Sequence, residues 1–579
     1  MRNRQNLIIL LIFTIGSALF IELNFRYWYA FMEQYMMFQT TKAYLLQHLS
    51  EVSGLTEYAT EFLSMAFYYP LCAGVIISLL LALASWAFHR FMSACGAKCS
   101  MLFAVAPAFL VLCFQQESIA HIITLCIALT SAMAYSRIKS NKIRYVVGLM
   151  AIVATYQLAA PAHFVLALLI AIYEITSSRR YAAVASAVAL SALLPLVAMN
   201  VLYPMPMREA FLSKHLAHPE AAFPTVLIVM GLAYPTVAIV AYALRDKVLI
   251  KSDLLRTRLT YGTLIAAVAA CILLKHDLME QAYRYDYYAR EGEWQKITDH
   301  YHHNGVRGFE ALVYVNLAAS YNGTLLSDFT YTPQFGIEGL YPTDVKFYIQ
   351  NIQASEVAWR IGHVNTAQRT AFIGTLGSRR SIQPRLMQRL VESYLVTGEM
   401  EVAEKFIKIL ESYPRLKKWA TAQRPLLNPD VAAQTDWIAQ KRSLAPTTDN
   451  MHDMQKAFPL AVEALIIDRP KNKAAFDYLM AFTLAYKDLN NFLSYIRPMK
   501  GQPIDKLYQE ALCVCMAVGE ITQQEAAEFG VDEAVQKRFA SFSQSMQRLD
   551  AESMRKMYGD TYFYYLQYVQ TPQMPVNEQ

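Results

Sequence analysis

The N-terminal part of the chain places acidic, basic and imidazole side chains beside strongly apolar stretches. A carboxylate or an imidazole can take up a proton or bind a divalent metal ion, and an arginine or lysine can hold a phosphate. Such groups are costly at membrane depth, so those that occur there more often serve a function than those on an aqueous surface. The residues that qualify are Glu22, Arg26, Glu33, Gln34, Glu117, His121, Gln157, His163, Arg208 and Lys214.

The elements that must position these groups are apolar segments long enough to cross a membrane. Runs of about 18 or more apolar residues predict nine spans. The spans are expected near residues 7–23, 67–89, 101–116, 118–136, 143–158, 160–176, 181–203, 223–244 and 258–275. No small-x-small cleavage site follows Leu23, so the first segment is interpreted as an uncleaved span and not as a signal peptide.

Lysine and arginine gather in every second connector between these spans. The basic connectors hold Arg2 and Arg4, Arg90 and Lys98, residues 137–144, Arg179 and Arg180, and residues 245–258. The opposite connectors are nearly free of these residues, which predicts an N-terminus inside and a C-terminal half outside. The expected location is an inner membrane of the bacterial type with a periplasmic C-terminal half. The third and fifth spans are short, and an error of two in the count leaves the side unchanged.

Composition agrees with a chain that is half membrane-embedded and half soluble: 55% of the residues are hydrophobic, 17% are charged, and the mean hydropathy is +0.22. The net charge of +6 comes mostly from the basic connectors, so it does not indicate nucleic-acid binding. Two domains are predicted, residues 1–275 in the membrane and residues 276–579 exported. Of the eight cysteines only Cys513 and Cys515 are exported, and two residues apart on a helix they point in different directions.

The sequence pattern of the exported half predicts pairs of helices separated by short glycine or asparagine turns. In the clearest pair, a first helix ends at Gly398, the small Ala403 lets the second helix approach closely, and Pro414 closes the unit. This stretch resembles a tetratricopeptide repeat. We therefore expect an all-α chain, with a helical repeat array that buries a shared core and presents a face to a peptide or protein.

Residues 24–66, between the first two spans, are rich in tyrosine, phenylalanine, methionine and glutamine, which suits helices lying in the membrane interface. An acid near the outer end of the first span, a long amphipathic loop, many short spans and an exported tail together resemble the GT-C superfamily of lipid-linked-sugar glycosyltransferases. Oligosaccharyltransferases and protein O-mannosyltransferases belong to it. The local motif is Glu33-Gln34, followed by Phe38, Ala43, Leu45, Gly54 and Tyr68-Tyr69-Pro70.

The resemblance implies roles for the polar residues. Glu33 is expected to be the general base, Glu117 and His121 its partners, and Arg26, Arg208 and Lys214 the groups that hold the donor phosphate. Glu22, Gln34, Gln157 and His163 form a second tier. No Asp-x-Asp, Glu-x-Asp or WWD-type signature is present, so metal use and substrate class stay open. If a divalent cation (Mn²⁺ or Mg²⁺) takes part, its ligands are expected to be Glu33, Glu117 and His121.

Several residues have simpler interpretations. Glu51, Glu57 and Glu61 are interpreted as a solvated helix face, and the histidines 300, 302 and 303 as surface residues. The leading hypothesis is transfer of a sugar or oligosaccharide from a polyprenyl-(pyro)phosphate donor to an exported acceptor, most specifically protein O-glycosylation. The alternative is a non-enzymatic membrane scaffold that anchors a repeat array to an envelope or secretion complex. That alternative predicts that Glu33, Glu117 and His121 are packed or paired, with no cavity between them.

Overall fold

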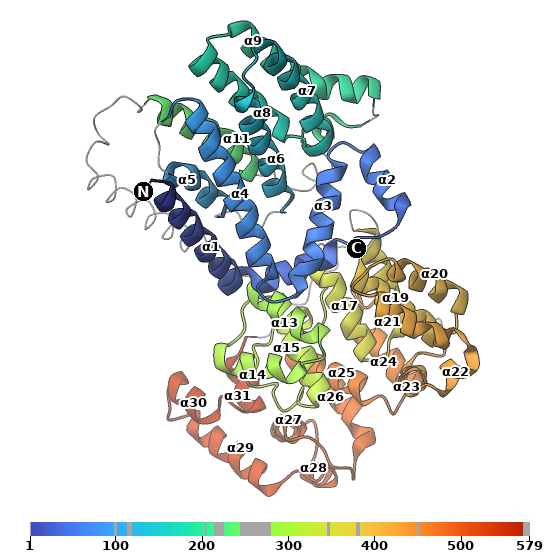
Figure 1. The fold of residues 1–579 in the computed structure, drawn as a ribbon. Coiled ribbons are helices and arrows are strands. Elements are labelled where there is room, and N and C mark those ends of the chain that lie inside the picture. Colours follow the sequence, from blue (N-terminus) through green and yellow to red (C-terminus); the bar gives the residue numbers. More distant parts are fainter. Residues whose placement is uncertain are drawn as a thin grey trace. The chain divides into compact units, whose positions relative to one another are not determined.

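The computed structural model describes residues 2–97, 101–112, 119–202, 205–212, 225–243, 279–343, 348–377, 383–448 and 452–570. Within these ranges the regular structure is helical and contains no β-strand (Figure 1). The contacts divide the chain into two compact units. Unit 1 comprises Met1–Asp277 together with the short segment Ser412–Arg415, and unit 2 comprises Leu278–Glu411 and Leu416–Gln579.

The described helices of unit 1 coincide with the first eight predicted spans or lie in the first predicted outer loop, except for the short helix Met207–Leu212, which lies in the predicted connector between the seventh and eighth spans. They are α1 (Arg2–Met32), α2 (Lys42–Ser50), α3 (Gly54–Ser64), α4 (Cys72–Ala94), α5 (Met101–Leu112), α6 (Ala120–Arg137), α7 (Asn141–Ala159), α8 (Ala162–Tyr173), α9 (Tyr181–Val197), α10 (Met207–Leu212) and α11 (Thr225–Ala243). The ninth predicted span, residues 258–275, lies outside the described residues.

Three helical segments of the described chain are long and apolar enough to cross a membrane: Arg4–Met32, Cys72–Ala94 and Tyr181–Leu202. Met101–Leu112, Ala162–Ser178 and Met230–Ala243 are apolar but shorter. The first helix also runs further than the sequence predicts. The first outer loop was expected to begin at Asn24, whereas α1 continues to Met32 because no helix-breaking residue interrupts residues 24–32.

Small residues let α4 pack closely against its neighbours. A Cβ atom on Gly74 would lie 2.6 Å from the carbonyl oxygen of Ala18 in α1, so only glycine fits at this crossing. Further along α4, Ala84 and Ala87 are fully buried in the same apolar cluster. The polar groups at one end of the bundle are paired: Arg144 Nε donates to Glu174 Oε1 at 2.8 Å, and the Tyr135 hydroxyl donates to the same oxygen at 2.7 Å. Glu174 therefore serves the structure of unit 1.

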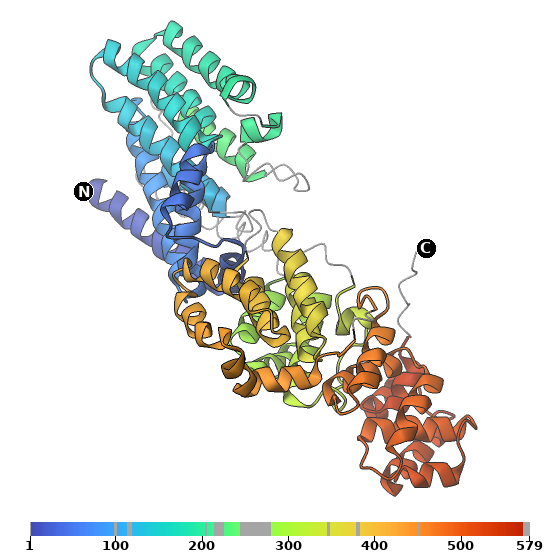
Figure 2. The ribbon, with the colours of Figure 1, turned by 90° about the vertical axis from the view of Figure 1, so that its right-hand side faces the viewer.

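Unit 2 is an all-helical array in its described residues (Figure 2). Its helices are α13 (Glu280–Arg290), α14 (Trp294–Asn304), α15 (Phe309–Asn322), α16 (Ile337–Leu340), α17 (Tyr348–Arg360), α18 (Val364–Leu376), α19 (Pro384–Thr397), α20 (Met400–Glu411), α21 (Lys417–Gln423), α22 (Pro429–Gln434), α23 (Asp436–Leu444), α24 (Phe458–Asp468), α25 (Lys473–Ala485), α26 (Leu489–Ile496), α27 (Lys506–Ala517), α28 (Gln523–Glu528), α29 (Glu533–Ser545), α30 (Ala551–Tyr558) and α31 (Tyr562–Tyr568).

The pair α19–α20 forms as its sequence pattern predicts. Gly398 ends α19 in the left-handed conformation with φ +91°, which glycine adopts without steric strain. Ala403 is fully buried, and the rings of Tyr394 and Phe406 stack with centroids 5.8 Å apart between the two helices. A small residue and a ring pair therefore fix the spacing of this helical hairpin.

A network of buried charges joins α13, α17 and α19 in unit 2. Arg385 donates to Asp286 and, at 3.3 Å, to Glu356. Arg389 donates to Glu356 at 2.8 Å and to Glu392 at 2.7 Å. Although burial opposes the shift, Arg389 and Arg385 lower the pKa of the Glu356 carboxyl. Each charge in this network is stabilised by an opposite charge, so removal of one member leaves another unpaired.

The substitution Arg385→Met is expected to lower the free energy of unfolding of unit 2 by roughly 3–5 kcal/mol, because the buried Asp286 would lose its guanidinium partner and Glu356 would keep only that of Arg389. Hydrogen exchange of the full-length protein in urea, followed on peptides from α13 and α19, measures the loss. Lys537→Met is the matched control, since Lys537 and its partner Glu533 are 73% and 79% exposed. Equal stability of the two variants would contradict the proposed importance of the network.

Candidate functional site

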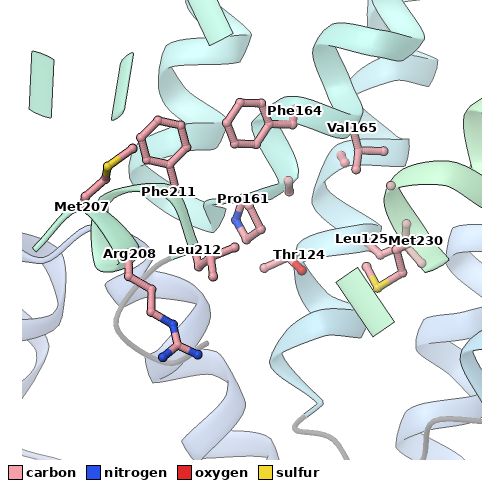
Figure 3. A pocket seen from close by; sticks show the side chains of 13 residues that line it. Thr124, Leu125, Pro161, Phe164, Val165, Met207, Arg208, Phe211, Leu212 and Met230 are labelled. Atoms are coloured by element: carbon pink, nitrogen blue, oxygen red, sulfur yellow. The ribbon is translucent and has the colours of Figure 1, made fainter. Parts of the chain in front are cut away.

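Unit 1 contains a cavity of about 760 Å³ between four elements: α6, the α7–α8 turn with the start of α8, α10 and α11 (Figure 3). Its walls are mostly aliphatic and aromatic. The lining residues are Thr124, Leu125, Ala128, Pro161, Ala162, Phe164, Val165, Met207, Arg208, Phe211, Leu212, Met230 and Gly231. A cavity of this size in an apolar bundle is large enough for a small-molecule or lipid ligand.

Among the described residues that line the cavity, Arg208 is the one that carries a charge. The rings of Phe164 and Phe211 stack with centroids 6.2 Å apart, and in Figure 3 the guanidinium of Arg208 points away from this ring pair. Thr124 adds a hydroxyl to a wall that is otherwise apolar. The arrangement suits an amphipathic ligand with a long apolar part and an anionic group, because a guanidinium binds phosphate or carboxylate oxygens in a fork.

Hydrogen bonds between distant segments hold the cavity walls in place. The Tyr156 hydroxyl of α7 donates to the carbonyl of Ala210 in α10 at 3.1 Å. Two hydroxyls of the first outer loop, Ser53 and Thr56, donate to the carbonyls of Ala160 and Leu158 at 3.0 and 2.6 Å. The outer loop is therefore bonded to the turn that carries Pro161, one of the cavity walls.

Of the residues predicted to hold the donor phosphate, Arg208 lines the cavity and Arg26 does not. Arg26 lies on α1, with Nε 3.7 Å from Glu22 Oε1 and its guanidinium over the Tyr27 ring. Glu22 also accepts a hydrogen bond from the backbone of Leu71 at 3.0 Å, so it is bonded to the residue directly before α4. Lys214 lies outside the described residues, as does Glu117.

The predicted imidazole and amide groups lie next to the cavity wall and not in it. His121 is buried on α6, one turn before Thr124, whose hydroxyl bonds to the His121 carbonyl at 2.7 Å. His163 is fully buried between two lining residues, but its Nε2 donates to the Ser191 carbonyl at 3.2 Å. The Gln157 amide donates to the Glu51 carbonyl at 3.3 Å. For Gln157 and His163 these bonds indicate a structural role.

Glu33, the predicted base, does not line the cavity. It is fully buried in a short 3-10 turn, next to the buried Gln34. Its Oε1 accepts hydrogen bonds from the Tyr413 hydroxyl and, at 2.9 Å, from Arg415 Nε, both in the segment that groups with unit 1. The Arg415 guanidinium lies over the Tyr68 ring at 4.2 Å. No local pattern in the sequence predicts this partnership, because 380 and 382 residues separate Glu33 from its two partners.

No group of three or more histidine, cysteine, aspartate or glutamate residues that could hold a metal ion occurs in the part of the chain that the structure describes. Glu33 and His121 belong to that part, whereas Glu117 does not. A metal centre made of all three residues therefore stays a prediction.

The interpretation of the outer-loop acids as a solvated face is wrong for two of them. Glu57 and Glu61 are buried. Glu61 Oε2 accepts the Tyr44 hydroxyl and lies 3.1 Å from Nε2 of the fully buried His48, whose Nδ1 donates to the Tyr44 carbonyl at 2.8 Å. Helix α3 turns this face inward because α2 packs on it, and the pairing of Glu61 with a tyrosine and a histidine offsets its burial.

Unit 2 has a cluster of cations around one tryptophan that the sequence pattern did not reveal. The Arg389 guanidinium and the Lys441 ammonium lie 4.2 and 4.8 Å from the centroid of the Trp359 ring. Lys441 Nζ also donates to the Trp359 carbonyl at 2.6 Å. Burial, followed by the nearby charges of Arg389 and Arg360, lowers the pKa of the Lys441 amine to about 7.

Lys441 is therefore expected to react with an acylating reagent in a pH range where ordinary lysines are protonated. Its labelling rate by an N-hydroxysuccinimide ester should rise up to about pH 8 and then level off, since the neutral amine is the nucleophile and its pKa is about 7. Labelling of Lys537, which is 73% exposed, should keep rising through pH 9. Peptide mass spectrometry of the labelled full-length protein measures both profiles, and parallel profiles would contradict the shift.

Comparison with known proteins places the chain by family and by nothing more specific. No curated protein and no solved structure matches it. A family model described as a family of unknown function, DUF6057, matches residues 2–569. The match covers nearly the whole chain, both units included, and the chain therefore belongs to the DUF6057 family.

Proposed function

We propose that this DUF6057 chain is a membrane glycosyltransferase that moves a sugar or an oligosaccharide from a polyprenyl-(pyro)phosphate donor to an exported acceptor. The observation that carries the proposal is the apolar cavity of unit 1 with Arg208 as its charged lining residue. The proposal keeps the predicted nine-span topology, in which Arg208 belongs to an outer connector and unit 2 is periplasmic. The resemblance of the membrane half to the GT-C plan supplies the reaction class.

Donor binding follows from the chemistry of the cavity. A polyprenyl chain is a long branched hydrocarbon, and its transfer from water to an apolar wall is favourable in proportion to the area buried. The phosphate end needs a cation, which Arg208 supplies with fork geometry. The stacked rings of Phe164 and Phe211 give the hydrocarbon a flat surface. The cavity thus accommodates both ends of the same donor molecule.

Transfer then requires a group that accepts a proton. The acceptor hydroxyl oxygen bonds to the anomeric carbon of the sugar, the bond from that carbon to the phosphate oxygen breaks, and the phosphate leaves with the electron pair. The hydroxyl proton passes to a carboxylate, for which Glu33 is the candidate. Because Arg415 and Tyr413 occupy Glu33 Oε1, this role requires that the segment Ser412–Arg415 move before the proton is taken.

The helical repeat unit would present the acceptor. Repeat arrays bind extended chains, which favours an exported protein and makes protein O-glycosylation the most specific form of the proposal. A glycan acceptor fits the same chemistry, since it also offers a hydroxyl. A divalent cation, Mn²⁺ or Mg²⁺, would assist by neutralising the departing phosphate, with Glu33, Glu117 and His121 as its predicted ligands.

The second candidate function is a non-enzymatic membrane scaffold, and the environment of Glu33 favours it. A carboxylate that is fully buried and paired with a guanidinium at 2.9 Å is a common structural feature. His121 is likewise buried in the helix bundle. In this alternative the chain anchors unit 2 to an envelope or secretion complex, and the cavity holds no reacting lipid.

Replacement of Arg208 tests donor binding. Arg208→Gln is expected to lower photo-crosslinking of a diazirine-bearing polyprenyl phosphate by about tenfold or more, since a charge-assisted hydrogen bond to the phosphate is lost. Lys42→Gln is the control, because Lys42 is an exposed cation of the first outer loop that does not line the cavity. Crosslinked peptides should come from α8 and α10. Equal crosslinking of the wild type and Arg208→Gln would contradict the proposal.

Two substitutions at one ion pair separate the two candidate functions. Glu33→Gln removes the base and is expected to lower consumption of a labelled polyprenyl-phosphate-linked sugar in membranes by about 10²–10⁴-fold. Arg415→Gln breaks the same ion pair but keeps the carboxylate, so consumption should stay near that of the wild type. Thermal unfolding of both variants is the control for folding.

The scaffold predicts a different pattern for this pair of variants. Both substitutions should then lower stability to a similar extent, and the wild type itself should consume no lipid-linked sugar. That pattern would rule out the transferase, whereas loss of consumption in Glu33→Gln alone would rule out the scaffold.

A further inference from the structure

A second cavity of unit 1, about 670 Å³ in volume, lies where the start of α1 meets the end of α4 and the start of α5. It shares no lining residue with the Arg208 cavity. Its polar wall comes from α4, with Trp86, His89, Arg90 and Ser93, and from Asn6 of α1. Among the described lining residues none is acidic, and Arg90 carries a positive charge.

Internal hydrogen bonds fix the frame of this second cavity. The Asn6 side-chain amide lies 3.3 Å from His89 Nε2, and its Oδ1 accepts the backbone N–H of Met101 at 3.2 Å. The Ser93 hydroxyl donates to the His89 carbonyl at 2.8 Å. These bonds join α1, α4 and the start of α5. Arg90 follows His89 on α4 and is exposed. Its guanidinium lies 5.9 Å from the Trp86 ring centroid.

The apolar wall of the second cavity continues onto an exposed aliphatic surface. Leu7 lines the cavity and is 57% exposed, and Leu11, one turn further along α1, is 52% exposed. The helix that carries them is one of the three long enough to cross a membrane. A polar cavity at the end of such a helix, with a tryptophan, a cation and an aliphatic track, matches the layered chemistry of a membrane interface.

We propose that this second cavity binds the phosphate headgroup of an anionic phospholipid, with Arg90 as the phosphate ligand and the acyl chains along Leu7 and Leu11. A guanidinium binds phosphate oxygens through parallel N–H bonds, and tryptophan favours the headgroup level of the bilayer. The aliphatic track distinguishes a lipid from a soluble phosphate, because a soluble ligand gains nothing from it. The site does not depend on the proposed transferase function, since it uses other residues.

Native mass spectrometry of the full-length protein in detergent, titrated with phosphatidylglycerol or with phosphatidylcholine, tests the proposal. The wild type should retain phosphatidylglycerol in preference to phosphatidylcholine. Arg90→Gln is expected to weaken phosphatidylglycerol binding by about fivefold or more, the effect of one cation near a phosphate. Arg137→Gln is the matched control, because Arg137 is an exposed cation at the end of α6 that does not line the cavity.

Two further measurements test whether the lipid binds in this cavity and whether a soluble phosphate can replace it. Ser93→Trp, a substitution at an exposed lining position, should block the cavity and weaken lipid binding as Arg90→Gln does. Inorganic phosphate at millimolar concentration should leave the bound lipid in place. Unchanged lipid binding in both variants, or displacement of the lipid by inorganic phosphate, would overturn the proposal. Polyprenyl phosphate crosslinking at the Arg208 cavity should be unaffected by Arg90→Gln, so this test and that of the transferase fail separately.

Discussion

Desolvation of polar groups in the apolar interior of unit 1 is the constraint on which the rest of that unit depends. Burial of a polar side chain there removes its hydrogen bonds to water, and a partner within the protein lowers that cost. Glu174 meets Arg144 and Tyr135, and His163 meets the Ser191 carbonyl. Arg208 is half-buried and lines a cavity of about 760 Å³. Its charge at the edge of an apolar cavity makes this guanidinium the candidate ligand for an anionic group.

Unit 2 also buries charged side chains, and opposite charges stabilise one another there. The residues Arg385, Arg389 and Glu356 are exposed by less than a seventh of their side-chain area, and they offset their desolvation through mutual contacts. Burial and the nearby charges of Arg389 and Arg360 outweigh the effect of Glu392 and Glu356 on Lys441, so the pKa of its amine falls to about 7. The desolvation of buried charges thus explains both the pairing of Arg385 and Arg389 with Glu356 and the lowered pKa of Lys441.

The positions of helices could be predicted from the sequence, whereas side-chain contacts between distant segments could not. Within the described residues, apolar runs coincide with helices of unit 1, and three of these segments are long and apolar enough to cross a membrane. The turn at Gly398 was also predictable, since a left-handed residue at a helix end favours glycine. By contrast, the spacing of the outer-loop acids predicts a solvated Glu61, because spacing alone does not show that α2 covers it. The pairing of Glu33 with Arg415 depends on chain segments far apart in sequence, which no local pattern records.

The two cavities of unit 1 differ in a way that bears on their ligands. In its described lining the Arg208 cavity is apolar except for one guanidinium and a threonine, whereas the Arg90 cavity has a wall that includes amide, imidazole and hydroxyl groups. In the predicted topology Arg208 belongs to an outer connector and Arg90 to an inner one. An apolar cavity favours a ligand that inserts its hydrocarbon, and a polar one favours a headgroup whose hydrocarbon stays in the bilayer. A donor that reacts and a lipid that anchors the protein would therefore occupy different sites.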